Sequence, residues 1–313
     1  MESVAELVLR LARDDYFEQQ KAAWDLVERG REAVKPLVEA LIGGRPRQRY
    51  KAAWALGRIG DSRAVDPLCR AMLCDDDEVV REWSAAALEE LGDLSAVPSL
   101  VDALRFDRSQ DVRLRASLAL RGLSAKEALM ELLAVPESSS RGMAITALAR
   151  LGCKEAMGMA AILLNDEDSE VRRRAAAFMG SVATPEAAEV LRPALADEDL
   201  AVRDECLKAL GCIKGGVALE MACVALGDED PRVRLTAVQV LGEIGLAMGV
   251  DALVAILSGE DHDEIRAWAA WSLGEIGDRR AVEPLLKASR SGPKAVQEKA
   301  LASLREVFGM DIR

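Results

Sequence analysis

The chain has 313 residues, of which 50% are hydrophobic, 30% are charged and only 4% are aromatic. Its formal net charge of −12 repels phosphate groups, so we expect neither a nucleic-acid partner nor an anionic membrane partner. No apolar stretch approaches the ~18 residues of a membrane span, and the N-terminus lacks the basic and apolar blocks of a signal peptide. The abundance of Ala and Leu, without β-branched or aromatic runs, favours helices.

A repeat begins within the first thirty residues. The segment QQKAAWDLVERG at 19–30 is followed by the similar RYKAAWALGRIG at 49–60, and further copies continue at about 31-residue spacing to QEKALASLREVF at 297–308. A period between 20 and 50 residues is typical of solenoids. We therefore predict one domain over residues 1–313, built from ten repeats at approximately 1–30, 31–60, 61–92, 93–123, 124–152, 153–183, 184–214, 215–245, 246–277 and 278–313.

Each repeat is predicted to contain two helices. The first is short and apolar, as in AVDPLCRAML at 64–73, and an acidic turn such as CDDDE follows it. Asp residues in this turn suit the N-cap and first turn of the next helix. The second helix carries Val-Arg near its start and Ala-Leu-Gly near its end, and we expect the Gly to help end it. The 28-residue spacing between Arg113 and Arg141 predicts an irregularity in the fifth repeat.

This pattern resembles HEAT repeats, specifically the HEAT-like repeats of the phycobilisome (bilin) lyase family, and the segment RYKAAWALGRIGDSRAVDPL at 49–68 carries the similarity most strongly. The resemblance covers essentially the whole chain. It implies an all-α fold, a right-handed α-solenoid (superhelix) of about ten helical hairpins. Such repeats serve many unrelated proteins, so the resemblance is informative about fold and weak about function.

An Arg column opens the second helices, and an Asp stands six residues before the Arg in five copies. The resemblance implies that these residues form a ladder that joins neighbouring repeats. The end copies carry Gln19 and Gln297 instead, as expected of terminal repeats with one neighbour, so we expect the fold to begin and end within this sequence. The ladder residues are Arg49, Arg81, Arg113, Arg141, Arg172, Arg203, Arg234 and Arg266, with Asp75, Asp107, Asp166, Asp197 and Asp228.

All five Trp lie on second helices and outside the predicted core stripe. Counted from the ladder position, apolar residues recur at −1, +3, +6, +7 and +10, which form one helix face. Trp24, Trp54 and Trp271 occupy +5, whereas Trp83 and Trp268 occupy +2. The resemblance places second helices on the concave face, so the +5 rings either form a binding ridge or cover Ala-rich grooves; for the +2 rings, packing is favoured. The predicted partner-binding residues are Trp24, Tyr50, Trp54, Trp83, Leu114, Leu118 and Trp271.

A local basic patch is predicted in the middle repeats. Salt bridges between its Arg side chains and acidic residues are the favoured interpretation, because solvated pairs of this kind are common. The alternative is a seat for carboxylates or phosphates, which Arg binds through two parallel hydrogen bonds. The residues are Arg115, Arg121, Arg150, Arg173 and Arg174.

Catalytic motifs are scarce. His262, in GEDHDEIR, is the single His, and the chain has no P-loop, Gly-x-Gly-x-x-Gly or Gly-x-Ser-x-Gly segment. The repeat pattern also resembles deoxyhypusine hydroxylase, but the His-Glu pairs that hold iron in that enzyme have no counterpart here. The six Cys form no Cys-x-x-Cys pair, which suggests reduced, apolar residues of a cytoplasmic protein. We expect no catalytic residue, no cofactor and at most weak metal binding by Asp261, His262 and Asp263.

The predicted function is a non-enzymatic scaffold or adaptor that binds a protein partner on its concave face, with its oligomeric state left open. The alternative, implied by the resemblance, is a bilin lyase-like protein or lyase subunit. In that case Trp and Tyr would stack on an open-chain tetrapyrrole while Arg paired with its propionates. Genes for phycobiliproteins in the source organism would favour this alternative.

Overall fold

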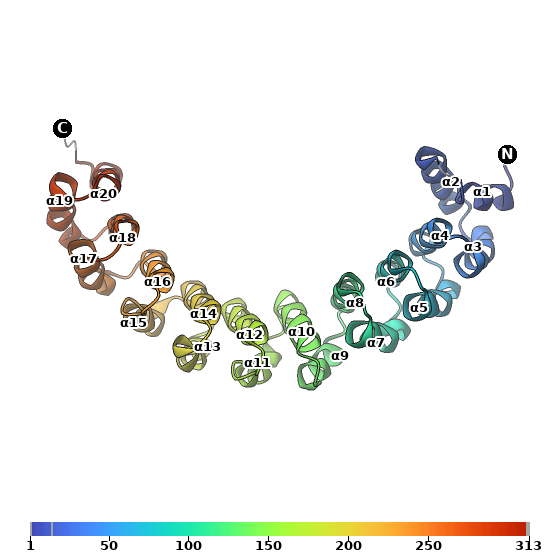
Figure 1. Ribbon diagram of the computed structural model, residues 1–313, viewed down its shortest axis with the longest axis horizontal. Coiled ribbons are helices and arrows are strands. Elements are labelled where there is room, and N and C mark those ends of the chain that lie inside the picture. The colour runs from blue at the N-terminus through green and yellow to red at the C-terminus, as the bar shows by residue number, and fades with distance from the viewer. Residues whose placement is uncertain (1, 14, 311–313) are drawn as a thin grey trace. The chain divides into compact units, whose positions relative to one another are not determined.

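The computed structural model describes residues 2–13 and 15–310, and this part of the chain is an all-α solenoid of stacked helical hairpins, as predicted. It divides into two compact units, Met1–Cys153 and Lys154–Arg313. Within each unit, first helices form one layer and second helices the other (Figure 1). The prediction of a single domain stays a prediction.

In the first unit, the first helices are α1 (Val4–Arg10), α3 (Arg31–Gly43), α5 (Val65–Cys74), α7 (Val97–Phe106) and α9 (Lys126–Glu131). Its second helices are α2 (Tyr16–Arg29), α4 (Pro46–Ile59), α6 (Glu78–Leu91), α8 (Gln110–Gly122) and α10 (Ser138–Arg150). Short 3₁₀ turns connect some of them: η1 (Ser62–Ala64), η2 (Leu94–Ala96) and η3 (Leu132–Ala134).

In the second unit, the first helices are α11 (Met157–Leu163), α13 (Pro185–Leu191), α15 (Gly215–Ala225), α17 (Val250–Ser258) and α19 (Val282–Ser291). Its second helices are α12 (Ser169–Val182), α14 (Leu200–Ile213), α16 (Pro231–Ile244), α18 (Asp263–Ile276) and α20 (Lys294–Glu306). The 3₁₀ turns are η4 (Lys154–Ala156), η5 (Pro193–Ala196), η6 (Ala247–Gly249) and η7 (Arg279–Ala281). None of the helices in the described ranges of the chain is long and apolar enough to cross a membrane.

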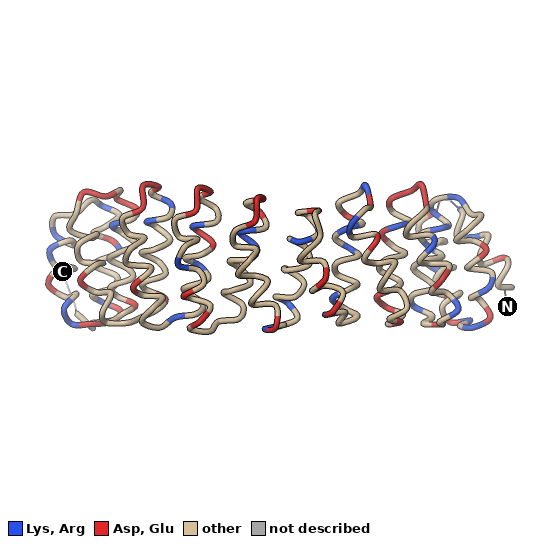
Figure 2. The backbone as a smooth tube through the Cα atoms, turned by 90° about the horizontal axis from the view of Figure 1, so that it is seen from below, with Lys and Arg blue, Asp and Glu red and all other residues tan. Residues whose placement is uncertain are grey.

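The acidic turns start the second helices, as their sequence indicates. The Asp77 carboxylate accepts a hydrogen bond from the Val79 N–H at 2.9 Å, and Asp168 caps α12 in the same way through Glu170. These side chains satisfy N–H groups that have no partner inside the helix. In the second unit, Figure 2 shows acidic segments capping successive hairpins along one edge.

The Gly of the Ala-Leu-Gly signature has a different role from the predicted one. Gly57 lies inside α4, and a Cβ added there would come within 2.8 Å of the Ala87 Cα on α6. The absence of a side chain therefore lets neighbouring second helices approach closely. The helix ends at Ile59, and its C-cap is Gly60, whose φ of +74° is in the left-handed region.

The predicted ladder joins neighbouring repeats within each unit. Arg81 is only 3% exposed, and its guanidinium donates two hydrogen bonds to the Asp107 carboxylate at 2.7 and 3.0 Å. Its remaining Nη1 donates to the Asp75 carbonyl at 2.8 Å, in the turn of its own repeat. One buried Arg thus joins two successive turns. Two side-chain hydrogen bonds also join each of the other ladder pairs, Arg49–Asp75, Arg172–Asp197, Arg203–Asp228 and Arg234–Asp261.

The irregularity expected in the fifth repeat is a missing rung. Val135 stands where five other repeats place the ladder Asp, six residues before the Arg. Arg113 still donates to the Asp107 carbonyl at 2.7 Å, but its buried Nε has no hydrogen-bond partner. The helix α9 of this repeat has only 6 residues. The contact between the fourth and fifth repeats therefore lacks the Arg–Asp rung that joins the second repeat to the third and the third to the fourth. An ion pair between Arg105 and Glu137, 3.2 Å apart, joins the fourth and fifth repeats instead.

Candidate interaction site

Aromatic side chains from three successive second helices meet in the first unit. The Trp24 and Trp54 ring centroids lie 5.0 Å apart at 82°, an edge-to-face contact between α2 and α4. The Tyr50 and Trp83 rings stack between α4 and α6, with centroids 6.5 Å apart and an angle of 28°. They surround a space of about 190 Å³, called the aromatic hollow here, which is lined by Tyr16, Gln20, Trp24, Tyr50, Lys51, Trp54 and Trp83.

The repeated KAAW motif explains why these rings face outward. In α4 the Ala pair of the motif, Ala52 and Ala53, is fully buried, and the same holds for the Ala pair of α2. Because the Trp follows the Ala pair, it lies on the opposite side of the helix from the core stripe. Trp24 is 47% exposed and Trp83 38% exposed, whereas Trp54 is half-buried. Large aromatic surface thus remains accessible around the hollow.

Lys51 is the one charged residue that lines the aromatic hollow. Its side chain is 7% exposed, and its ammonium donates to the Gln20 amide oxygen. The same group lies 5.2 Å from the Tyr16 ring centroid and 5.5 Å from that of Tyr50. Burial lowers the pKa of Lys51 below its ordinary value. No carboxylate of the described residues forms an ion pair with it.

The sequence interpretation did not select Lys51. Lys51 lies at the +2 column, which Trp83 and Trp268 also occupy. It is the first residue of the KAAW motif that ends at Trp54. The available signal was the basic composition of α4: between Gly44 and Gly60 stand five Lys or Arg and no Asp or Glu. In a chain of net charge −12, that run marks an electrostatically distinct helix.

The other aromatic candidate belongs to the second unit and does not line the aromatic hollow. Trp271 contacts Trp268 within α18, with ring centroids 5.3 Å apart at 79°. The ammonium of Lys299 on α20 lies 5.2 Å from the Trp268 centroid. On α8 of the first unit, Leu114 is 49% exposed and Leu118 is half-buried, and neither lines the hollow.

Most of the predicted basic patch is paired with acids. Arg173 and Arg174 both bind Glu170, at 2.8 and 2.7 Å. These two ion pairs lower the pKa of Glu170 to about 2, and the pair with Arg173 has the larger effect. Arg115 lies 3.4 Å from Glu82. Such partly exposed pairs contribute little stability. Arg121 and Arg150, in the first unit with Arg115, make no ion pair with any residue that the structure describes.

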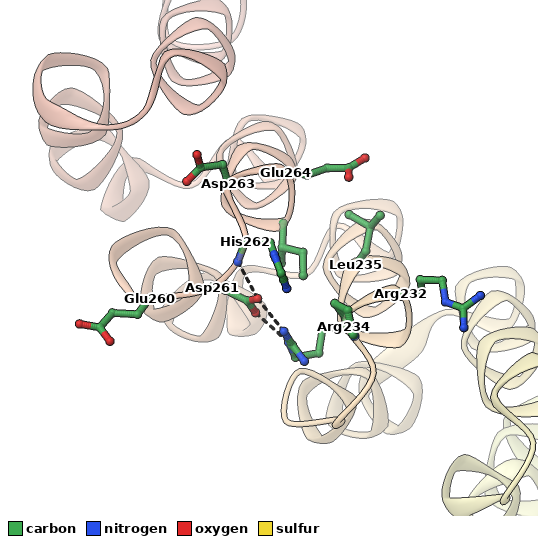
Figure 3. Close-up of a pocket in the computed structure, with 10 residues that line it drawn as sticks. Arg232, Arg234, Leu235, Glu260, Asp261, His262, Asp263 and Glu264 are labelled. Atoms are coloured by element: carbon green, nitrogen blue, oxygen red, sulfur yellow. Dashed lines mark hydrogen bonds and ion pairs between the residues drawn. The ribbon is translucent and has the colours of Figure 1, made fainter.

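A hollow of about 730 Å³ lies at the turn edge of the eighth and ninth repeats (Figure 3). Asp261 lies at its centre, and its carboxylate accepts two hydrogen bonds from Arg234, at 2.8 and 2.7 Å. This pairing lowers the pKa of Asp261. Asp261 is therefore a ladder acid, missed in the sequence because it precedes its Arg266 by five residues and not six. Arg232 and Glu260 project in opposite directions from it, so these two charged side chains do not converge on the hollow.

The described ranges contain no group of three or more His, Cys, Asp or Glu side chains placed to hold a metal ion. No disulfide joins the Cys residues in the part of the chain that the structure describes. Burial raises the pKa of the Cys206 thiol to about 12 and also raises that of Cys69. These thiols remain protonated at neutral pH, in contrast to reactive thiolates, so they act as apolar core residues.

A family model for HEAT repeats matches residues 4–89, 34–121, 126–211 and 219–305. No curated protein matches the chain in sequence. Among solved structures, the chain is similar to an engineered protein, with 24% identity, a TM-score of 0.46, and coverage of 98% of this chain and 99% of that one.

Two further structures share the solenoid fold. The karyopherin Kap121p bound to Pho4p is 16% identical with a TM-score of 0.56, covering 96% of this chain and 45% of that one. A structure of Kap95p with RanGDP is 13% identical with a TM-score of 0.53, covering 96% and 53%. The chain therefore spans about half the length of these relatives, and at such identities the likeness concerns the fold alone.

Proposed function

The chain belongs to the HEAT repeat family, and we propose that it is a non-enzymatic scaffold that binds a partner protein on the concave face predicted for its second helices. The observation that carries the proposal is the aromatic hollow, where rings from α2, α4 and α6 remain partly exposed around one space. Exposed Trp and Tyr clusters of this kind are typical of binding hot spots. Kap121p, seen bound to Pho4p, is a precedent for a protein partner on such a solenoid.

The size of the aromatic hollow favours a protein side chain as its occupant. Pockets for small-molecule ligands usually measure about 300–1,000 Å³, whereas this space measures about 190 Å³. An open-chain tetrapyrrole has four pyrrole rings and exceeds it, so the bilin lyase alternative gains no support from this site. A partner segment can instead place one anchor residue in the hollow and lie across the neighbouring helices. A cytoplasmic location belongs to the same proposal and agrees with the absence of disulfides among the described residues.

Affinity capture with two matched double variants tests the site. One variant, Trp24→Ala with Trp54→Ala, opens the aromatic hollow; the other, Trp268→Ala with Trp271→Ala, removes the aromatic pair of α18. We expect the first variant to lose a partner that the wild type and the second variant retain, with circular dichroism confirming that both variants stay helical. Retention by both variants would contradict the proposed sites. Loss in the second variant alone would move the site to the ninth repeat.

A further inference from the structure

The helix α4 presents cations and an aromatic ring on one face. Arg47, Lys51, Trp54 and Arg58 follow one another at spacings of four, three and four residues, which places them along one side of an α-helix. The Arg58 guanidinium lies 5.7 Å from the Trp24 ring centroid, and its side chain is 46% exposed beside Glu90, 3.8 Å away. The apolar walls of the hollow therefore stand next to positive charge.

The ammonium of Lys51 has unused donor capacity. An ammonium carries three N–H donors and accepts nothing, and the only hydrogen bond that Lys51 makes among the described residues goes to the neutral Gln20. Its other neighbours there are the faces of Tyr16 and Tyr50. Burying a charge without a counter-ion is costly, and the cost falls when a carboxylate arrives, because charge-assisted hydrogen bonds are about twice as strong as neutral ones.

A cationic ligand does not suit this space. Aromatic hollows can bind quaternary ammonium or methylated Lys groups through the ring faces, but the Lys51 ammonium already lies over two of the rings that line it. A second cation in a space of about 190 Å³ would be repelled at close range. The nearby acids Glu82 and Glu90 lie within ion-pair distance of Arg115 and Arg58, which limits the repulsion they exert on an incoming carboxylate.

We infer that the aromatic hollow binds an acidic partner segment that carries a bulky apolar side chain beside a carboxylate. The apolar side chain lies against Trp24, Trp54 and Trp83, and the carboxylate accepts a hydrogen bond from the Lys51 ammonium. Arg58 lies at the rim and favours further acidic residues in the same segment. This inference rests on the proposed function and adds the chemistry of the partner to it.

A random peptide library displayed on phage and selected on the full chain tests the inference. We expect the recovered peptides to combine an aromatic or large aliphatic residue with Asp or Glu one or two positions away. Replacing that acid by its amide, or Lys51→Met in the protein, should weaken binding of the synthetic peptide about tenfold, the effect of losing one charge-assisted hydrogen bond of ~1.4 kcal/mol. Met keeps the apolar stem of Lys51 and removes the ammonium, and Lys21→Met is the matched exposed control.

Other outcomes separate this inference from the proposed function. Two results would overturn the inference and leave the scaffold proposal standing. In the first, the selected peptides contain no acid although they fail to bind the Trp24→Ala, Trp54→Ala variant. In the second, acidic peptides bind Lys51→Met as tightly as the wild type. Selected peptides that bind the Trp24→Ala, Trp54→Ala variant unchanged would contradict the aromatic hollow as the site altogether.

Discussion

At the scale of single residues, the same motif places two kinds of side chain in opposite environments. The Ala pair of KAAW is buried in each copy, and the Trp that follows is not. Lys51 departs from the simple rule that Lys is exposed, because Tyr16 and Tyr50 cover its ammonium. Such a residue influences both binding and stability, and the two effects can be measured separately.

The stability of the wild type should rise with pH relative to Lys51→Met. Burial lowers the pKa of Lys51 in the folded chain below its ordinary value of 10.5. Between the folded and unfolded pKa values the unfolded chain binds more protons, so the free energy of unfolding increases as the pH rises through that window. Urea unfolding of both proteins, from neutral pH up to about pH 10, measures the difference in their free energies of unfolding. We expect the value for the wild type to rise relative to that for Lys51→Met as the pH increases. A constant or opposite difference would contradict the assigned burial.

At the scale of helices, α12 illustrates two special positions near the end of a second helix, with different physical roles. In α12, Gly180 faces α14, and a Cβ added there would come within 2.9 Å of the Ala209 Cα. The C-cap of the same helix is Ala183, with φ of +51°. The first position needs a small residue because of its neighbour, whereas the second needs one because of its backbone.

Substitutions at these two positions should change stability in opposite directions. Gly180→Ala should destabilise the chain by about 1–3 kcal/mol, because overpacking outweighs the better helix propensity of Ala. Ala183→Gly should stabilise it by about 1 kcal/mol, because the left-handed conformation is unfavourable for L-residues with a side chain. Thermal unfolding followed by circular dichroism measures both. If Gly180→Ala raised the midpoint, the close helix approach would not be the reason for Gly at this position.

At the scale of the whole molecule, the ladder gives the excess of acidic residues a structural use. The chain has 53 Asp and Glu against 41 Lys and Arg, and many of the acids lie in the turns, where they cap helices and hold ladder Arg residues. In the first unit the run of rungs stops at Arg113. Backbone angles at Val135, φ −76° and ψ 155°, resemble those of Asp75, φ −70° and ψ 138°. The turn therefore has the conformation of a ladder turn without the acid.

Val135→Asp should restore the missing rung and stabilise the first unit. The new carboxylate would give the buried Arg113 Nε an acceptor, a contribution of about 1.5–3 kcal/mol for a hydrogen bond to a charged group. Urea unfolding should show a higher midpoint for the variant at neutral pH. The gain should vanish in an Arg113→Gln background; if it persisted there, it would come from a different interaction.

Much of the fold could be predicted from the sequence because its determinants are local and repeated. The ladder rungs Arg49–Asp75 and Arg81–Asp107 are confirmed, and so is the hairpin pattern. Asp261 was missed because the turn between it and Arg266 is one residue shorter than in the other copies. The predicted role of Gly57 was wrong because its neighbour Ala87 is 30 residues away in the sequence. The partner-binding and anion-binding residues stay predictions.

Helix periodicity was sufficient to predict the HEAT repeats, the hairpins and the position of the Trp residues outside the core stripe, because it converts the spacing of residues directly into a face of the helix. Which of these outward residues meet depends on how neighbouring helices pack. Trp24, Trp54 and Trp83 share one hollow with Lys51, whereas Trp271 pairs with Trp268 in the other unit. The physical reason is that a column in the repeat specifies a direction around one helix, while contact, burial and pKa depend on the side chains that neighbouring helices bring to the same place.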